Sequence, residues 1–67
     1  MAKISTYQAN DGRGRAEVHF DFKRELAYIQ YFDDNRRLFF TEEFPNNSLH
    51  YVEDAAENWA LGIKKLE

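Results

Sequence analysis

Four stretches in the first two thirds of the chain carry the β-branched and aromatic residues, and the apolar–polar alternation, that are typical of strands. We expect strands at residues 3–9, 15–22, 26–32 and 37–44. The alternation is strictest in RAEVHFDF (15–22), where every second side chain is apolar. Short polar segments separate the stretches, and the Asp-Gly turn in NDGRG (10–14) is the clearest of them. Strands joined by such short turns form an antiparallel meander.

The last third of the chain changes to a helical period, with apolar residues at steps of three, four and seven between residues 48 and 66. Pro45 ends the last strand, and Ser48 is one of three consecutive N-cap candidates. Gly62 costs about 1 kcal/mol relative to alanine inside a helix, and it marks either a point where this one would fray or a close approach of another backbone. We therefore predict one α+β domain, residues 1–67, with a meander of three to four strands and a C-terminal helix on one face. The predicted apolar stripe is Leu49, Val52, Ala55, Ala56, Trp59, Ile63 and Leu66.

The turns set the register and therefore the face on which each side chain lies. A two-residue turn at Lys23-Arg24 pairs Phe20 with Ala27. A turn centred on Asp34-Asn35 pairs Tyr31 with Leu38. The expected helix-facing set is Val18, Phe20, Phe22, Ala27, Ile29, Tyr31, Leu38 and Phe40. The expected open face carries His19, Tyr28, Gln30, Phe32, Phe39 and Thr41. A slip of one residue at either turn would exchange the two sets on a strand.

Aromatic residues make up 16% of the chain, and one helix can cover only one face of a four-stranded sheet. An exposed aromatic cluster on the other face is typical of an interaction surface. We expect partner contacts at Tyr28, Phe32, Phe39 and His19, and a homodimer that buries what one small chain leaves exposed. The alternative is that these are scattered exposed aromatics, or that the N-terminal strand covers them.

Four arginines, Arg13, Arg15, Arg36 and Arg37, belong to two turns at the same end of the predicted sheet. Guanidinium groups beside aromatic rings can bind phosphates and stack on bases, as sheet-type single-strand binders do. A nucleic-acid-binding module is therefore the alternative function. Against it, Asp11, Asp33 and Asp34 can neutralise these arginines, and the net charge is −3.

A second charged feature is acidic. Carboxylates precede the predicted helix and continue along its outer side, at Glu42, Glu43, Glu53, Asp54 and Glu57. Such a stripe can engage a basic patch on another protein. It is also what an ordinary solvated helix face looks like.

Catalytic chemistry has little support in the sequence. The chain has no cysteine and two histidines, and Glu17, His19 and Asp21 alternate as any exposed strand face does, without metal-ligand spacing. We expect no enzymatic activity, cofactor or metal. No apolar run is long enough to span a membrane and no signal peptide is evident, so we expect a cytoplasmic protein without membrane contact.

The second half of the chain carries a resemblance. YFDDNRRLFFTEEF (31–44), followed by YVEDAAENWALGIKKL (51–66), resembles small proteins encoded by tailed phages, particularly those of marine cyanobacteria. In that group a hairpin with an Asp/Asn turn leads into a helix with an AAENW-like centre. The resemblance implies a small accessory protein that binds a host or phage protein.

Overall fold

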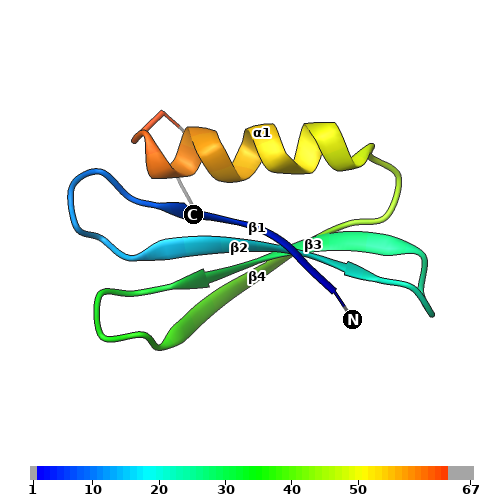
Figure 1. Cartoon of the computed structure of the whole chain (residues 1–67), viewed down its shortest axis with the longest axis horizontal. Coiled ribbons are helices and arrows are strands. Elements are labelled where there is room, and N and C mark those ends of the chain that lie inside the picture. The colour runs from blue at the N-terminus through cyan, green and yellow to red at the C-terminus, as the bar shows by residue number, and fades with distance from the viewer. Residues whose placement is uncertain (1, 64–67) are drawn as a thin grey trace.

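The computed structural model describes residues 2–63 as four strands followed by one helix (Figure 1). Each strand pairs antiparallel with the next, so the sheet order is β1-β2-β3-β4. This confirms the predicted α+β meander with a C-terminal helix. The elements are β1 (Ala2–Gln8), β2 (Arg15–Asp21), β3 (Leu26–Phe32), β4 (Leu38–Phe44) and α1 (Leu49–Ala60).

The core lies between α1 and one face of the sheet. Trp59 of the helix packs edge-on against Tyr31 of β3, with ring centroids 5.1 Å apart. Trp59 and Tyr31 are both buried, so the two largest core side chains meet at the centre of the layer. The same layer holds Ala16, Val18, Ala27, Ile29, Phe44, Val52, Ala55, Ala56 and Ala60.

The predicted register between β2 and β3 is confirmed, since Phe20 pairs with Ala27 and Val18 with Ile29. Asp21 stabilises the connecting turn by accepting hydrogen bonds from the backbone N–H groups of Lys23 and Arg24. The expected burial of Phe22 is wrong. Phe22 lies in this turn, is 66% exposed, and among the described aromatic rings contacts that of Phe20.

The predicted register between β3 and β4 is wrong by two residues: Tyr31 pairs with Phe40 instead of Leu38. One residue comes from the turn, where the Asp33 carboxylate accepts from the N–H groups of Asn35 and Arg37. The loop holds residues 34–36, one more than expected, and Arg36 takes the left-handed conformation, φ 66°, that three-residue hairpin loops use. The second residue is a β-bulge at Phe39, between the pairs Phe32–Leu38 and Tyr31–Phe40.

These two shifts have opposite effects on the face of each side chain. The longer turn moves Leu38 to the face away from the helix, where it pairs with Phe32, so its expected helix-facing position is wrong. The bulge then reverses the change, and Phe40 returns to the helix side as predicted. Phe39 also lies on the helix side, as its ring is 6.4 Å from that of the core residue Tyr31. The expected open-face position of Phe39 is therefore also wrong.

Helix α1 begins where the sequence predicts and ends earlier. The Ser48 hydroxyl accepts from the backbone N–H of Tyr51, which makes Ser48 the N-cap. At the other end Gly62 has φ 84° and donates to the carbonyl of Trp59, while Ile63 donates to that of Asn58. This pair of hydrogen bonds is a Schellman motif, which needs a left-handed residue and therefore favours glycine. Gly62 terminates the helix, and residues 64–66 of the predicted helix lie outside the described residues.

Candidate interaction surfaces

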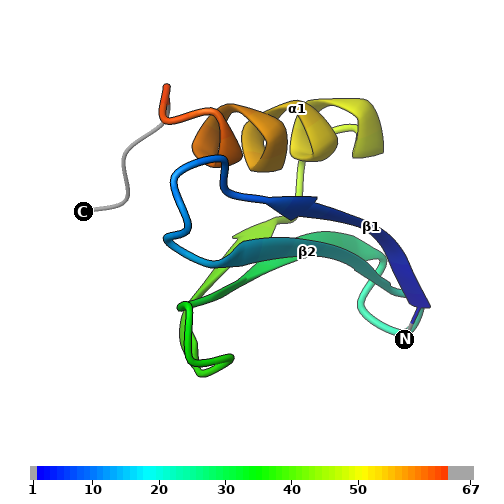
Figure 2. The same cartoon turned by 60° about the vertical axis from the view of Figure 1, so that its left-hand side comes forward.

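Helix α1 packs over β1, β2 and β3, and β4 forms an edge of the sheet (Figures 1 and 2). In both views the hairpin of β3 and β4 extends away from the helix. The apolar residues at the start of β4 are consequently exposed: Leu38 by 50%, Phe39 by 51% and Phe40 by 39%. These three consecutive apolar residues, Phe39 and Phe40 on the helix side and Leu38 on the opposite face, make one exposed apolar edge, which we call the β4 patch.

The β4 patch is continuous with the core. Tyr31 contacts Trp59 on one side and the rings of Phe39 and Phe40 on the other, at 6.4 and 5.9 Å between centroids. The aromatic layer thus starts under the helix and ends in solvent at β4. A layer that a neighbour could extend without rearrangement is typical of an interface.

A carboxylate borders this aromatic layer. The Tyr31 hydroxyl donates to Glu42 Oε1 at 3.0 Å. Burial raises the pKa of Tyr31 well above its ordinary value, and the negative charge and hydrogen bond of Glu42 raise it further. The neutral phenol therefore holds a half-buried carboxylate on β4, beside Phe40.

The sheet face away from the helix is polar and internally paired. Arg15 Nε donates to Glu17 at 2.8 Å, and His19 Nε2 lies 3.1 Å from the other carboxylate oxygen. Burial alone would raise the pKa of Glu17, but the hydrogen bonds from Arg15 and His19 outweigh it and lower that pKa. Two stacked pairs flank this carboxylate: the Arg15 guanidinium over Phe32, and the ring of His19 on that of Tyr28.

The four predicted partner-binding residues therefore do not form one exposed apolar cluster. Tyr28 and Phe32 face away from the helix as expected, but Tyr28 is only 6% exposed and Phe32 is half-buried. His19 is largely covered, and its ring lies parallel to that of Tyr28 at 5.2 Å. Phe39 is exposed, but it belongs to the β4 patch on the helix side.

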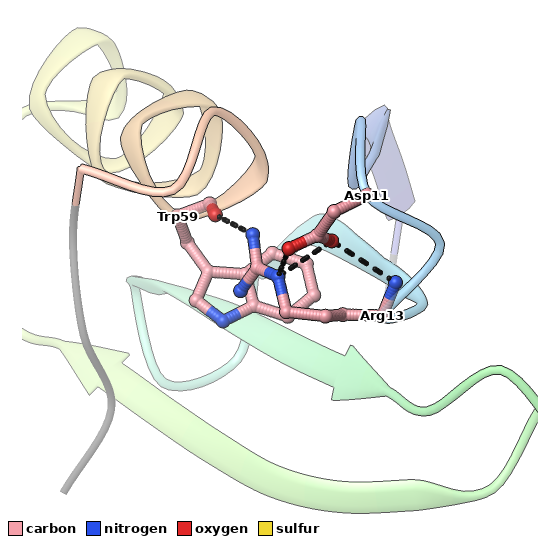
Figure 3. A network of polar contacts seen from close by, with 3 residues as sticks. All are labelled: Asp11, Arg13 and Trp59. Carbon is pink, nitrogen blue, oxygen red and sulfur yellow. Dashed lines mark hydrogen bonds and ion pairs between the residues drawn. The ribbon is translucent and has the colours of Figure 1, made fainter.

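The four predicted nucleic-acid-binding arginines are also separated. Arg13 turns toward the helix, where its Nη2 donates to the carbonyl oxygen of Trp59 at 2.7 Å (Figure 3). Its guanidinium lies over the indole ring, 4.7 Å from the centroid, and its Nε donates to Asp11. The backbone N–H of Asn10 donates to the carbonyl of Ala60. The first hairpin thus donates hydrogen bonds to carbonyls at the C-terminal end of α1. Arg13 therefore has a structural role, with its guanidinium group bound within the chain.

Arg15 and Arg36 remain together on the polar face. With Lys3 they line a shallow hollow of about 410 Å³, whose other walls are Thr6, Gln8 and Glu17. Arg37 does not join them. Arg37 precedes the first residue of β4, and its backbone carbonyl accepts a hydrogen bond from the N–H of Asp33.

Sequence reasoning missed Leu38 and Phe40 as surface residues, because it placed both under the helix. The signal that could have identified them is the apolar run Leu38-Phe39-Phe40, which no strand with one buried face requires. It also missed Glu42 as the partner of a buried tyrosine.

Two further features of the described part of the chain concern other classes of site. Within residues 2–63, no group of three or more histidine or acidic side chains is arranged to hold a metal ion. The one described helix, α1, is too short and too polar to cross a membrane.

Comparisons of the chain with protein-family models, with curated proteins and with solved structures found no match. The resemblance of residues 31–44 and 51–66 to phage-encoded proteins therefore stays a prediction.

Proposed function

We propose that this chain is a protein-interaction module without enzymatic activity of its own, and that it self-associates through the β4 patch. The observation that carries the proposal is the aromatic layer from Trp59 through Tyr31 to Phe39 and Phe40, which is covered by α1 at one end and open at the other. Burying exposed apolar area is the main favourable term in protein association.

The size of the chain supports the same proposal. A domain of this length buries only about 60% of the surface that its unfolded chain exposes, so its core is small. Nine large apolar side chains of the described part are exposed, and the three of the β4 patch are consecutive. A neighbour that covers them would add stability that the single chain lacks.

The experiment compares two substitutions with the same chemical change. Phe39→Glu places a charge in the β4 patch, while Phe22→Glu places one at the far turn, where the ring is more exposed still. We expect light scattering to give a dimer for the native chain and for Phe22→Glu, and a folded monomer for Phe39→Glu. Equal masses for the two variants would contradict the proposed surface.

A second candidate function is binding of single-stranded nucleic acid at the hollow on the polar face. The observation that favours it is the convergence of Lys3, Arg15 and Arg36 on one hollow with a single carboxylate, Glu17, in its wall. Phosphate contacts by such a set would make binding salt-sensitive. An anisotropy titration of labelled mixed-sequence oligonucleotides at low salt tests this, with Arg15→Glu/Arg36→Glu expected to abolish binding and Lys23→Glu expected to retain it. No anisotropy change with the native chain would exclude this candidate.

A further inference from the structure

The outer edge of β4 has no neighbouring strand among residues 2–63. An edge strand presents unpaired backbone N–H and C=O groups, which another strand can pair with. The β4 patch lies on this same edge, so a strand added here would satisfy backbone groups and cover apolar side chains together.

The charges along this edge are ordered. Two arginines, Arg36 and Arg37, precede the apolar run, and two glutamates, Glu42 and Glu43, follow Thr41. Neither arginine forms an ion pair within the described part of the chain. When such a strand meets a copy of itself in antiparallel orientation, the basic end of each strand lies beside the acidic end of the other.

The bulge at Phe39 determines which register of this pairing matches the two faces. Directly opposed residues of an antiparallel pair point to the same face. Phe39, Phe40 and Glu42 point to the helix side, whereas Leu38 and Thr41 point to the polar side. If the alternation of β4 is continued back by one residue from Leu38, Arg37 is placed on the helix side. A two-fold axis between Phe39 and Phe40 opposes Phe39 to Phe40, Leu38 to Thr41, and Arg37 to Glu42. Every opposed pair then shares a face. A bulge usually hinders pairing at a sheet edge, but in this register the two bulges lie opposite each other and the faces still match.

We propose that the partner at β4 is a second copy of this chain, paired antiparallel about an axis between Phe39 and Phe40 to form one eight-stranded sheet. The inference rests on the proposed self-association and adds its geometry. At each end of the pairing the Arg37 guanidinium of one copy lies beside Glu42 of the other, the carboxylate that accepts from Tyr31. At the centre, the four phenylalanine rings of Phe39 and Phe40 cover one another.

Charge reversal gives a specific test. Arg37→Glu makes the edge acidic and Glu42→Arg makes it basic, so each variant opposes like charges in its own dimer. We expect each to raise the dimer dissociation constant by about tenfold or more. The double variant Arg37→Glu/Glu42→Arg restores opposite charges and should dimerise nearly as the native chain does. An equimolar mixture of the two single variants should form heterodimers. Sedimentation velocity, at a protein concentration equal to the dissociation constant of the native dimer, measures the dimer fraction in all four samples.

Lys23→Glu and Glu57→Arg are matched controls, since they make the same charge changes at exposed positions away from β4. Both should dimerise as the native chain does. If the native chain is a dimer and the β4 variants behave as these controls do, the inferred pairing is wrong while self-association stands. A native chain that is monomeric at hundreds of micromolar would instead overturn the self-association itself.

A cross-link tests the register independently of any effect of Glu42→Arg on folding. The chain has no cysteine, so Leu38→Cys and Thr41→Cys each introduce a single thiol. Opposed residues of antiparallel strands lie within the Cα separation that a disulfide needs. Random collision of the mixed variants would give the heterodimer in twice the yield of each homodimer. The inferred register predicts that mild oxidation gives almost only the cross-linked heterodimer, because the thiol of the Leu38→Cys variant then opposes that of the Thr41→Cys variant. A heterodimer yield only twice that of each homodimer, or no cross-link, would overturn the register.

Discussion

The Arg13 guanidinium lies over the indole ring of Trp59, 4.7 Å from its centroid, and donates to the backbone carbonyl of the same residue at 2.7 Å. The contact joins the first hairpin to the end of α1, 46 residues apart in the chain. A cation beside the carbonyls at a helix C-terminus also opposes the negative end of the helix dipole.

Removing this contact should destabilise the fold. Arg13→Gln loses a charge-assisted hydrogen bond and the stacking on Trp59, and we expect it to lower the free energy of unfolding by about 1–2 kcal/mol. Arg24→Gln is the matched control, because its ion pair with Glu43 is solvent-exposed and screened by water, so it should contribute less to stability. Urea denaturation followed by the fluorescence of Trp59, the sole tryptophan, measures both. An equal decrease in the free energy of unfolding of the two variants would show that the Arg13 contact stabilises the fold no more than an exposed ion pair does.

Gly14 should tolerate no side chain. Its φ is 136°, and a Cβ there would overlap the carbonyl oxygen of Phe32 and lie 2.9 Å from backbone atoms of Asp33. Backbone atoms cannot move aside as a flexible side chain can, so we expect Gly14→Ala to cost about 3 kcal/mol or more. Gly12→Ala also falls at a positive φ, 79°, but this lies closer to the left-handed region and the new methyl group has open space around it, so it should cost only about 1 kcal/mol. A smaller loss for Gly14→Ala than for Gly12→Ala, measured by thermal unfolding, would contradict this contact between the two turns.

Tyr31 should make the protein sensitive to alkaline pH. Because its pKa is raised in the folded state, the folded chain keeps the phenol proton above the ordinary value of 10.0, where the unfolded chain releases it. Stability is therefore present below that value and is lost as the pH rises through and above it. Tyr31→Phe has no phenol to titrate, so its stability should not fall in this range. At neutral pH it should be about 1 kcal/mol less stable than the native chain, because the hydrogen bond to Glu42 is lost. The urea midpoints of the native chain and of Tyr31→Phe should therefore approach each other between about pH 8 and about pH 11. A constant difference between the two midpoints over this range would contradict the raised pKa of Tyr31.

Glu17 should act in the opposite direction at acidic pH. Its pKa is lowered in the folded state by Arg15 and His19, so its contribution to stability is present above the ordinary value of 4.5. The contribution is lost as the pH falls below that value and through the folded pKa. Glu17→Gln should flatten the stability profile in this range, whereas Glu57→Gln, at an exposed helix position, should not. Identical acid profiles for the two variants would count against the paired carboxylate on the polar face.

Local patterns in the sequence were enough to predict the element order and the β2–β3 pairing. The strict alternation of 15–22 and the short turn at Lys23-Arg24 leave little freedom there. The end of the helix was harder to predict, because helical periodicity continues past Gly62 and only the Schellman hydrogen bonds show that the backbone turns away. Residue patterns alone therefore define a helix face better than a helix end.

The candidate surface depended on features that no local pattern contains. One extra turn residue and the bulge at Phe39 cancel each other along most of β4, so Phe40 keeps its predicted face while Leu38 and Phe39 exchange theirs. The coverage of Tyr28 on the polar face arises from packing between strands, with His19 stacked upon it. Sequence reasoning predicted that exposed aromatics exist, and the structure determines that they gather at the edge strand.

The most direct test of self-association through β4 is the mass of the native chain by sedimentation equilibrium across a range of concentrations. Self-association through β4 predicts twice the mass of one chain at micromolar concentration, and a monomer for Phe39→Glu under the same conditions. A native chain that keeps the mass of a monomer up to hundreds of micromolar would contradict it.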